Sequence, residues 1–275
     1  MEQERRGSIV SESAPDLTGV VDVLDVAAAE LRHVGRLLGE AGESVWDRVL
    51  DWLVDDYFRV EVRGSRKLPA DGPAVIVANH SGAWGLDAFI LLKVLTRGLG
   101  RPVHVPADPL AFRFPVIGSY ARNNGAIPLD PLLGLEHLNA GQLVMLFPEG
   151  IAGLEKPFRE RYRLRPFGPG FAATALRTGA PVVPVSVVGA EEAFPKLGDI
   201  PFLARLFDLP YFPVTPLLPL PSKWLVTVGD PIPAPARPGS YAARSAAAHR
   251  LCTEARSAVQ AMADRDRGRR ETPFW

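Results

Sequence analysis

Uninterrupted runs of apolar residues divide the chain and predict strands that are buried on both faces of a sheet. Such runs stand at residues 74–78 (AVIVA), 143–147 (LVMLF) and 181–188 (PVVPVSVV). Apolar residues at every position, rather than at every second one, are typical of a sheet covered by helices on both sides. Shorter stretches predict further strands at residues 58–62, 102–105 and 224–229.

Segments with helical signals alternate with these strands. Asp130 followed by Pro131 suits an N-cap and a first helical residue, Ser240 suits the N-cap of an Ala-rich helix, and Gly179 suits a helix end. Helices are expected at residues 84–97, 131–141, 168–178 and 240–262. This alternation predicts an α/β fold in which a mixed, mostly buried sheet is flanked by helices.

The two ends of the chain have other patterns. Residues 1–16 are polar with mixed charge and predict a mobile tail. Residues 17–57 carry apolar side chains at helical spacing on both sides of a Gly-containing break, which predicts an N-terminal helical hairpin. The main domain is then expected at residues 58–263, followed by a charged, loose C-terminal tail at residues 264–275.

Composition narrows the class of protein. The 275 residues are 47% hydrophobic and 23% charged, which is typical of a globular chain, and the net charge of +0 argues against a nucleic-acid-binding protein. The single cysteine, Cys252, cannot form an internal disulfide, and the histidines are not at metal-binding spacing. No apolar stretch is long enough for a transmembrane helix, so we expect contact with a membrane only from its surface.

Two ionisable residues follow directly on buried strands. Asn79 and His80 come after AVIVA, and Glu149 comes after the LVMLF strand. Because ligand sites form at the carboxyl ends of strands in open α/β sheets, a common pocket is expected; two unrelated polar turns are the alternative. Asp87 could orient the His80 ring and stabilise its charged form, unless the two residues are an exposed pair in a turn.

Basic residues gather after Glu149 and predict contact with phosphate. They are Lys156, Arg159, Arg161, Arg163 and Arg165, with aromatic residues interleaved. Such a loop suits the phosphates of a lipid or of coenzyme A, although a solvated basic face would look the same. Arg122 stands beside small residues, which also suits phosphate contact; an ordinary surface arginine is the alternative.

These segments together resemble the four sequence blocks of the glycerolipid acyltransferase family, whose members are similar to lysophosphatidic acid acyltransferase. The blocks are residues 79–87, 118–122, 147–150 (FPEG) and 180–185 (APVVPV), and the resemblance covers residues 66–192. It implies an acyltransferase in which His80 is the general base and Asp87 orients it. It further implies that Arg122 contacts an acceptor phosphate and that Glu149, beside Gly150, holds the glycerol group.

The sequence departs from the family pattern at two positions. The first block usually places the acid five residues after the histidine, where this chain has Gly85, and Asp87 is seven residues after it. Two more residues of a regular helix rotate a side chain by about 200°, so we expect an irregular turn at residues 81–85. The third block usually has arginine where this chain has Ala152; Lys156 and Arg159 are the candidates to replace it, and a neutral acceptor such as diacylglycerol stays open.

The resemblance implies transfer of a fatty acyl group from acyl-CoA or acyl-carrier protein to a glycerolipid hydroxyl. No cofactor beyond this co-substrate and no covalent intermediate is expected, and backbone N–H groups near Gly82 are candidates to bind the oxyanion. We expect a cytoplasmic enzyme that is peripheral on the inner face of the membrane. The alternative is a lipid- or acyl-chain-binding protein of the same fold with impaired catalysis.

A Pro-rich apolar segment at residues 210–221 has three possible roles. Together with Phe202, Leu206 and Phe207 it could line an acyl-chain groove, rest on the bilayer, or form a loop packed on the core.

Overall fold

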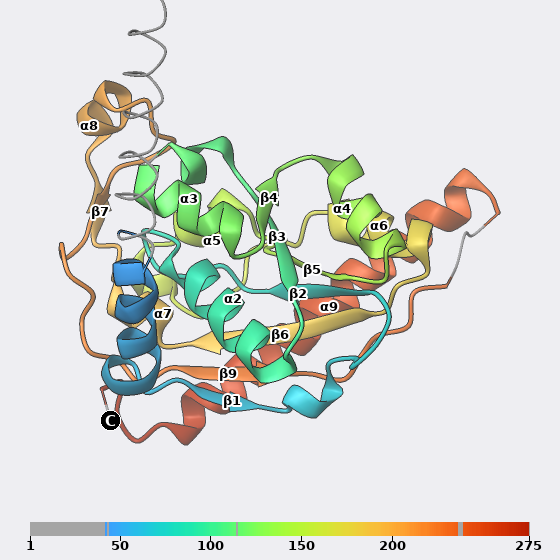
Figure 1. Ribbon diagram of the computed structural model, residues 1–275, viewed down its shortest axis with the longest axis horizontal. Helices are drawn as coiled ribbons and strands as arrows, with labels where there is room; N and C mark the ends of the chain where they lie inside the picture. The colour runs from blue at the N-terminus through green and yellow to red at the C-terminus, as the bar shows by residue number, and fades with distance from the viewer. Residues whose placement is uncertain (1–41, 43, 114, 236–238, 275) are drawn as a thin grey trace, which may run out of the picture. The chain divides into compact units, whose positions relative to one another are not determined.

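The computed structural model describes residues 42, 44–113, 115–235 and 239–274 (Figure 1). The strands are β1 (Glu61–Arg63), β2 (Ala74–Ala78), β3 (Val103–Ala107), β4 (Ala126–Pro128), β5 (Leu143–Leu146), β6 (Val182–Val188), β7 (Gly198–Asp199), β8 (Pro213–Val214) and β9 (Leu225–Val228). The α-helices are α2 (Leu86–Leu99), α3 (Pro115–Asn123), α4 (Pro131–Asn139), α5 (Ile151–Leu154), α6 (Gly170–Thr178), α7 (Ala190–Ala193), α8 (Pro201–Leu206) and α9 (Tyr241–Arg269). Short π- or 3₁₀-helical turns are η1 (Leu53–Tyr57), η2 (Ser65–Lys67), η3 (Pro109–Phe112) and η4 (Phe158–Glu160).

Seven strands form one mixed sheet in the order β1-β9-β6-β2-β5-β3-β4. All neighbouring pairs are parallel except β6 with β9, which is antiparallel. The three long apolar runs predicted as buried strands are β6, β2 and β5, and they lie side by side in the middle of the sheet. The mixed, mostly buried sheet expected from the sequence is therefore confirmed.

Alternate residues of β2 enter two separate hydrophobic cores. Ala74, Ile76 and Ala78 pack with α2, whereas Val75 and Val77 pack with α6 and α9. Figure 1 shows α2 on one side of the sheet and α9 on the other. A strand whose five residues are all buried has no polar face, which explains why the run AVIVA lacks the alternation of a half-exposed strand.

The helix signals of the sequence are confirmed at three positions. The Asp130 carboxylate accepts from Leu132 N at 2.8 Å, with Pro131 as the first residue of α4. The Ser240 hydroxyl accepts from Ala243 N at 3.1 Å at the start of α9. Gly179 ends α6 in the left-handed region, with φ of 75°.

The expected loose tail from residue 264 is wrong for its first residues, because α9 continues to Arg269. Asp266 is fully buried and its carboxylate accepts from the Thr227 hydroxyl of β9 at 2.5 Å. Arg270 then forms an ion pair with Glu192 at 2.6 Å. These long-range contacts hold the segment on the sheet, although its charged composition alone predicts a free end.

Other differences are local. The strand expected at residues 58–62 starts only at Glu61, because Phe58 ends the preceding helical segment and stacks on Trp224 with ring centroids 4.6 Å apart. Helix α3 and strand β4 were not predicted. Gly118 lies so close to the Phe112 carbonyl oxygen that a Cβ there would be only 2.7 Å away, so α3 packs tightly on the η3 turn at this position.

The predicted N-terminal hairpin and mobile tail fall mostly on residues 1–41, outside the described residues. Of this region, residues 44–57 are helical. They are joined to α2 by ion pairs from Lys93 to Asp47 and Asp51 and from Arg97 to Asp55. No helix in the described part of the chain is long and apolar enough to cross a membrane.

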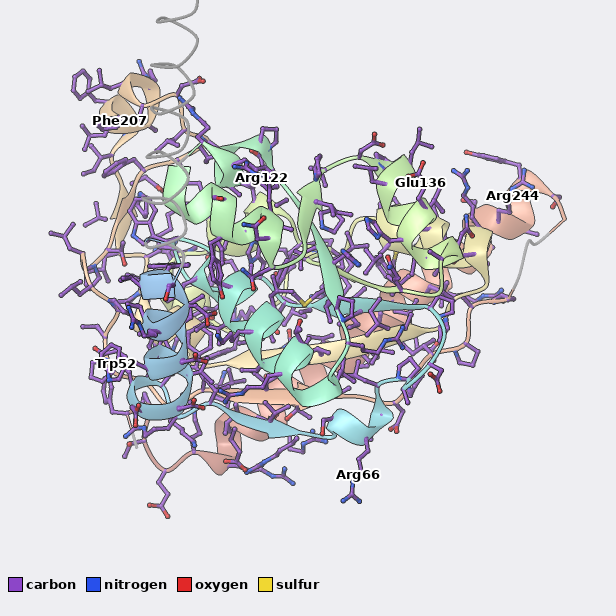
Figure 2. The ribbon with its side chains drawn as sticks, in the orientation of Figure 1. Trp52, Arg66, Arg122, Glu136, Phe207 and Arg244 are labelled. Atoms are coloured by element: carbon purple, nitrogen blue, oxygen red, sulfur yellow. The ribbon has the colours of Figure 1, made fainter. Side chains whose placement is uncertain are left out.

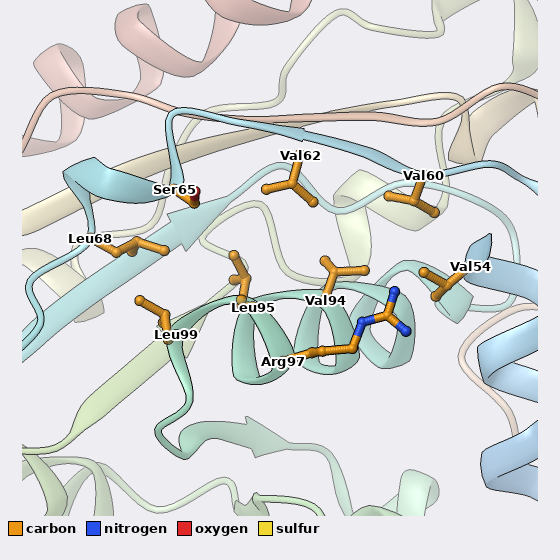
Figure 3. A pocket seen from close by; sticks show the side chains of 10 residues that line it. Val54, Val60, Val62, Ser65, Leu68, Val94, Leu95, Arg97 and Leu99 are labelled. Atoms are coloured by element: carbon orange, nitrogen blue, oxygen red, sulfur yellow. The ribbon is translucent and has the colours of Figure 1, made fainter.

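A cavity of about 180 Å³ lies between β1, η2 and the second half of α2 (Figure 3). Val62, Leu68 and Leu95 face it, and Arg97 stands at its side. Arg97 forms an ion pair with Asp55. The cavity lies along the C-terminal half of α2, whereas Asp87 stands in the first turn of this helix.

Candidate active site

Three neighbouring strands deliver acidic or basic side chains to the same edge of the sheet. Strand β2 is parallel to both β5 and β6. His80 follows β2, Glu149 follows β5, and Glu191 follows β6 at the start of α7. His80 and Glu149 therefore lie at the same edge of the sheet, since the carboxyl ends of parallel strands meet at one edge, and the common pocket expected for them stays a prediction.

His80 and Asp87 form a close pair at this edge. The His80 Nδ1 atom lies 2.9 Å from Asp87 Oδ2. The same oxygen accepts from Ser81 N at 2.7 Å, and Asp87 Oδ1 accepts from Ala88 N at 3.0 Å. The Asp87 side chain is fully buried, whereas the imidazole keeps 15% of its surface exposed. Asp87 is thus fixed by the backbone, and it fixes the Nδ1 edge of the His80 ring.

The unusual spacing of seven residues is accommodated by the turn between the two side chains. Helix α2 starts only at Leu86, so most of the intervening residues are not helical. Gly82 and Gly85 have φ of 88° and 69°, which only glycine adopts readily. A Cβ at Gly82 would also lie 3.0 Å from the Ala190 carbonyl oxygen. The irregular turn that the sequence required at residues 81–85 is confirmed.

Buried polar groups hold His80 from behind. The Asn79 amide donates to Val187 O at 2.9 Å and accepts from Val187 N at 2.8 Å, so it joins the end of β2 to β6. Glu149 Oε1 accepts from His80 N at 3.1 Å. The His80 ring stacks on Phe147, with centroids 4.2 Å apart and planes 21° apart. Backbone and ring of His80 are therefore both constrained.

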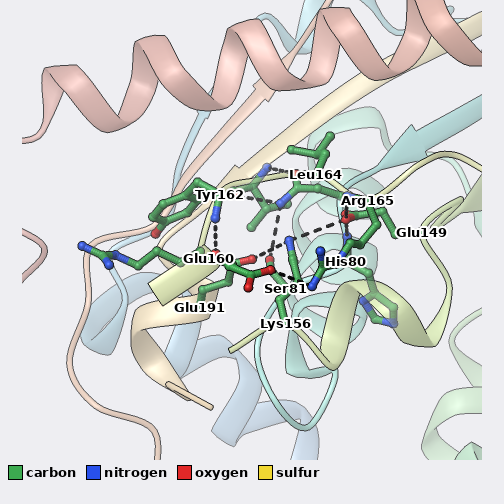
Figure 4. A network of polar contacts seen from close by, with 12 residues as sticks. His80, Ser81, Glu149, Lys156, Glu160, Tyr162, Leu164, Arg165 and Glu191 are labelled. Atoms are coloured by element: carbon green, nitrogen blue, oxygen red, sulfur yellow. Dashed lines mark hydrogen bonds and ion pairs between the residues drawn. The ribbon is translucent and has the colours of Figure 1, made fainter. Parts of the chain in front are cut away.

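Glu149 belongs to a buried network that includes Lys156 and Glu191 (Figure 4). Its Oε2 accepts from Arg165 N at 2.6 Å and lies 3.6 Å from Lys156 Nζ. Lys156 Nζ lies 2.7 Å from Glu191 Oε1, and Glu191 Oε2 accepts from Tyr162 N. Figure 4 shows the ammonium between the two carboxylates and the His80 ring pointing away from them.

Burial raises the pKa of two side chains of this network, Glu191 and Tyr162. Burial raises the pKa of Glu191, and the neighbouring Lys156 ammonium and the Tyr162 N–H only partly offset the rise. Burial also raises the pKa of Tyr162 well above its usual value, and the charge of Glu192 adds to the rise. The Tyr162 hydroxyl accordingly stays protonated and accepts from Gly189 N at 2.9 Å.

The other predicted site residues lie in different surroundings. Arg122 is exposed at the end of α3, with its guanidinium 5.7 Å from the Phe112 ring centroid (Figure 2). Arg159 is 83% exposed and weakly paired with Glu160 at 3.8 Å. Gly150 is the N-cap residue of α5 and has φ of 56°.

Lys156 does not belong to an exposed basic face with the arginines that follow it. Its side chain is only 2% exposed and lies between two carboxylates. The interpretation of all five cations as one solvated or phosphate-binding loop is wrong for this member, because the fold encloses it with Glu149 and Glu191. Phosphate could reach its ammonium only if that ion pair opened.

Sequence reasoning missed Glu191 as part of the site. The signal was the same as for His80 and Glu149, because Glu191 also follows an apolar strand closely. The contact with Lys156 across 35 positions could not be read from spacing. Within the described ranges, no three His, Cys, Asp or Glu side chains are grouped to hold a metal ion.

Comparison with known proteins identifies the class of this chain. The sequence model of the family described as Acyltransferase matches residues 59–188, which include the strands β2, β5 and β6 and the residues His80, Asp87 and Glu149. Over these residues, which are slightly less than half of the chain, the protein is similar to the acyltransferase family. Its fold resembles the crystal structure of the 1-acyl-sn-glycerophosphate (LPA) acyltransferase PlsC from Thermotoga maritima, with a TM-score of 0.55, 19% identity, and 86% of this chain and 84% of that chain covered.

This chain matches only part of the length of the curated relatives. A Mycobacterium tuberculosis (H37Rv) protein described as uncharacterized is 43% identical over 196 residues, which are 67% of this chain and 55% of that protein. The human protein named DGAT1/2-independent enzyme synthesizing storage lipids is 27% identical over 206 residues, covering 74% and 61%. A Brassica napus chloroplastic 1-acyl-sn-glycerol-3-phosphate acyltransferase is 31% identical over 150 residues, covering 50% and 40%. The chain thus spans about half the length of the first of these relatives.

Proposed function

We propose that this protein is an O-acyltransferase that moves a fatty acyl group from a thioester to a hydroxyl of a glycerolipid. The observation that carries the proposal is the His80–Asp87 pair. With Nδ1–H donated to Asp87, the lone pair of Nε2 is available, and no described protein group bonds to that nitrogen. A neutral imidazole with one fixed nitrogen and one free nitrogen is suited to general-base catalysis.

The reaction needs two proton transfers, one to His80 during the addition and one from His80 as the thiolate leaves. His80 Nε2 takes the proton of the acceptor hydroxyl while the hydroxyl oxygen adds to the thioester carbonyl carbon. The C–S bond then breaks, and the thiolate leaves and takes the proton back from the imidazolium. A thiol with a pKa of about 8.5 is a good leaving group, so no covalent enzyme intermediate is required. Asp87 stabilises the imidazolium between the two steps.

The turn after His80 supplies a candidate for binding the oxyanion. Ser81 N already donates to Asp87, and Ala83 N donates to Phe194 O at 3.4 Å. The N–H of Gly82, between them, meets no protein acceptor in the part of the chain that the structure describes. We assign this N–H to the carbonyl oxygen of the thioester, where charge develops during addition.

The proposed substrates follow from which basic side chains are free to bind phosphate and from the absence of the arginine usual in the third block. Ala152 replaces the arginine usual in the third block, and Lys156 is engaged by Glu149 and Glu191. This supports a neutral acceptor such as diacylglycerol beside lysophospholipids. We assign the exposed Arg122 and Arg159 to phosphates of a lipid or of the acyl carrier, which is coenzyme A or acyl-carrier protein. We place the enzyme at the inner face of the membrane as a peripheral protein.

An acceptor panel tests the proposal. Thiol release from long-chain acyl-CoA is measured with lysophosphatidic acid, other lysophospholipids and diacylglycerol in turn, and then with acyl-carrier protein as the donor. Release that depends on one acceptor supports the proposal and identifies the substrate. A protein that binds acyl chains but releases no thiol with any pair would instead be the binding protein of the same fold.

A further inference from the structure

A group of large apolar side chains lies exposed on the segment that follows α7. Their exposed fractions are 69% for Leu197, 71% for Phe202, 62% for Leu206, 53% for Phe207, 96% for Leu217 and 78% for Leu218. We call these six residues the apolar face. Single exposed leucines are ordinary in soluble proteins, but several on one segment mark an interaction surface. The alternative of a loop packed on the core is wrong for Leu217 and Leu218.

The apolar face is built as one unit. Gly198 and Asp199 of β7 pair with β8, and α8 connects the two strands. Leu197 N donates to Val214 O at 2.9 Å, and Leu220 N donates to Ala193 O of α7 at 2.8 Å. Figure 1 shows α8 and β7 on the side of the sheet where β6 ends in α7. The face therefore lies at the same edge as the candidate active site.

Aromatic contacts join the apolar face to the turn between His80 and Asp87. The Tyr211 hydroxyl donates to Ala83 O at 2.6 Å. Trp84, which is 45% exposed, meets Phe212 edge to face at 5.8 Å, and Phe212 stacks on Phe207 at 5.9 Å. An apolar path thus runs from the His80 turn to α8, where Figure 2 labels Phe207.

The charges of this segment suit a lipid surface. Residues 197–220 hold three charged side chains. Asp199 is paired with Lys196 at 2.9 Å and Asp208 lies 3.9 Å from Arg113, which leaves Arg205 exposed and outside these pairs. The segment and its two ion-pair partners, Lys196 and Arg113, therefore have three cationic and two acidic side chains. An apolar patch with a slight excess of cations complements a bilayer that contains anionic headgroups.

We propose that the apolar face docks on a lipid bilayer and so places the turn that carries His80 near the membrane that holds the acceptor. Trp84 and Tyr211 would then stand at the headgroup level, where amphipathic aromatic rings are favoured. The inference rests on the proposed function for its meaning, because a glycerolipid acceptor resides in the membrane. The docking itself is measurable without any catalysis.

Vesicle flotation with the full-length protein tests the docking. The vesicles contain phosphatidylcholine and phosphatidylglycerol, and the variant carries Leu217→Glu with Leu218→Glu. The matched control carries Leu129→Glu with Leu132→Glu, two leucines that are each 61% exposed at the start of α4, away from α8 in Figure 1. We expect binding to fall by about ten-fold or more in the first variant and little in the control. Equal binding by both variants and the unmodified protein would overturn the proposal.

A labelling experiment avoids the added charges. Cys252, the only cysteine, is changed to serine, and a cysteine labelled with the polarity-sensitive fluorophore NBD replaces Leu218 in one protein and Leu132 in another. Vesicles should shift the emission of the label at 218 to the blue and leave the label at 132 unchanged. A blue shift at 218 without vesicles, together with a doubled mass in light scattering, would mean that a second copy of the chain covers this face and would contradict bilayer docking.

Activity separates this inference from the proposed function. The Leu217→Glu, Leu218→Glu protein should keep transfer to a short-chain, water-soluble acceptor and lose most transfer to the same headgroup held in vesicles. If the variant loses both activities but still binds vesicles, the segment acts within the site and not in docking. If the unmodified protein floats with vesicles but transfers to neither acceptor, the proposed function fails while the docking stands.

Discussion

At the scale of single residues, the site depends on how Asp87 is held. Its buried carboxylate accepts two backbone N–H groups and contacts His80 Nδ1, so its position is set before any substrate arrives. Preorganisation of this kind is what allows an acid to keep an imidazole in the productive tautomer. We therefore propose that the charge of Asp87, and not only its shape, is required for catalysis.

The Asp87→Asn variant tests that requirement. The neutral amide cannot stabilise the imidazolium, so kcat should fall by about 10²-fold or more while the KM for the acceptor changes little. Initial rates of thiol release give both constants. Asp130→Asn is the control, because asparagine remains a good N-cap on exposed α4. An Asp87→Asn protein with the kcat of the unmodified protein would contradict the role of the pair.

Gly153 sets the space behind His80. A Cβ at this position would lie 2.8 Å from His80 O and 3.0 Å from His80 Cβ. Gly153→Ala should displace the end of β2, lower kcat by about ten-fold or more and lower the free energy of unfolding by about 1–3 kcal/mol. Gly98→Ala makes the same change within α2, where nothing lies within 4 Å, and should raise stability by about 0.5–1 kcal/mol. Unchanged kcat in Gly153→Ala would show that the contact does not constrain His80.

At the scale of elements, Lys156 connects the segments after β5 and β6. It stands between Glu149, which binds His80 N, and Glu191, which binds Tyr162 N. Removing one partner from a buried ion pair leaves an uncompensated charge, which costs far more than the pair contributes. The network therefore supports the site through its electrostatic balance.

Lys156→Met should lower the free energy of unfolding by about 3–5 kcal/mol at pH 7. Adding Glu191→Gln should recover part of this loss, since one unpaired carboxylate is removed. Because burial raises the pKa of Glu191 in the folded state, its protonated form favours folding, so the deficit of Lys156→Met should grow as the pH rises from about 4 through the raised pKa. Urea unfolding at several pH values measures this. Strictly additive effects of the two changes, or a deficit independent of pH, would rule out the coupling.

The helical segment at residues 44–57 has the opposite dependence on pH. The hydrogen bond from Lys93 lowers the pKa of Asp47, and the one from Arg97 lowers the pKa of Asp55. A depressed folded pKa gives stability that is present above the unfolded value of about 4 and is lost as the pH falls through the folded value. Amide hydrogen exchange in this segment, corrected for its intrinsic pH dependence, should show weaker protection at pH 3 than at pH 6, and protection that is equal at both pH values would contradict the assignment.

At the scale of the whole molecule, the features that could be predicted from the sequence are those that depend on a local pattern of residues. The runs at β2, β5 and β6 are apolar throughout because both faces of the central sheet are covered, so strand and burial could be inferred together. His80 and Glu149 follow such runs, and parallel strands place their ends at one edge. The pairing of His80 with Asp87 could be proposed as well, because an acid near a histidine can orient its ring and the family resemblance implies such an acid; the structure adds that glycines at 82 and 85 permit the necessary turn.

Two of the remaining features depend on partners that are distant in the sequence. Lys156 stands in a cationic stretch and is buried only because Glu191 arrives from β6. Residues beyond 263 stay helical because Asp266 meets Thr227. The third feature is local, because Gly118 of helix α3 packs closely on Phe112 of the turn before it. None of these contacts leaves a periodic signal, so pattern and composition predicted a phosphate-binding loop or a solvated basic face, a loose end and no helix.

The most direct test of the central claim compares the unmodified protein with His80→Ala in acceptor-dependent thiol release. The comparison uses the acceptor that the panel identifies, and circular dichroism verifies that the variant is folded. Loss of the general base should lower kcat by about 10²- to 10⁴-fold, while binding of the acyl donor is retained. A folded His80→Ala protein that transfers acyl groups at the rate of the unmodified protein would contradict the account, because the base would then have to be another residue.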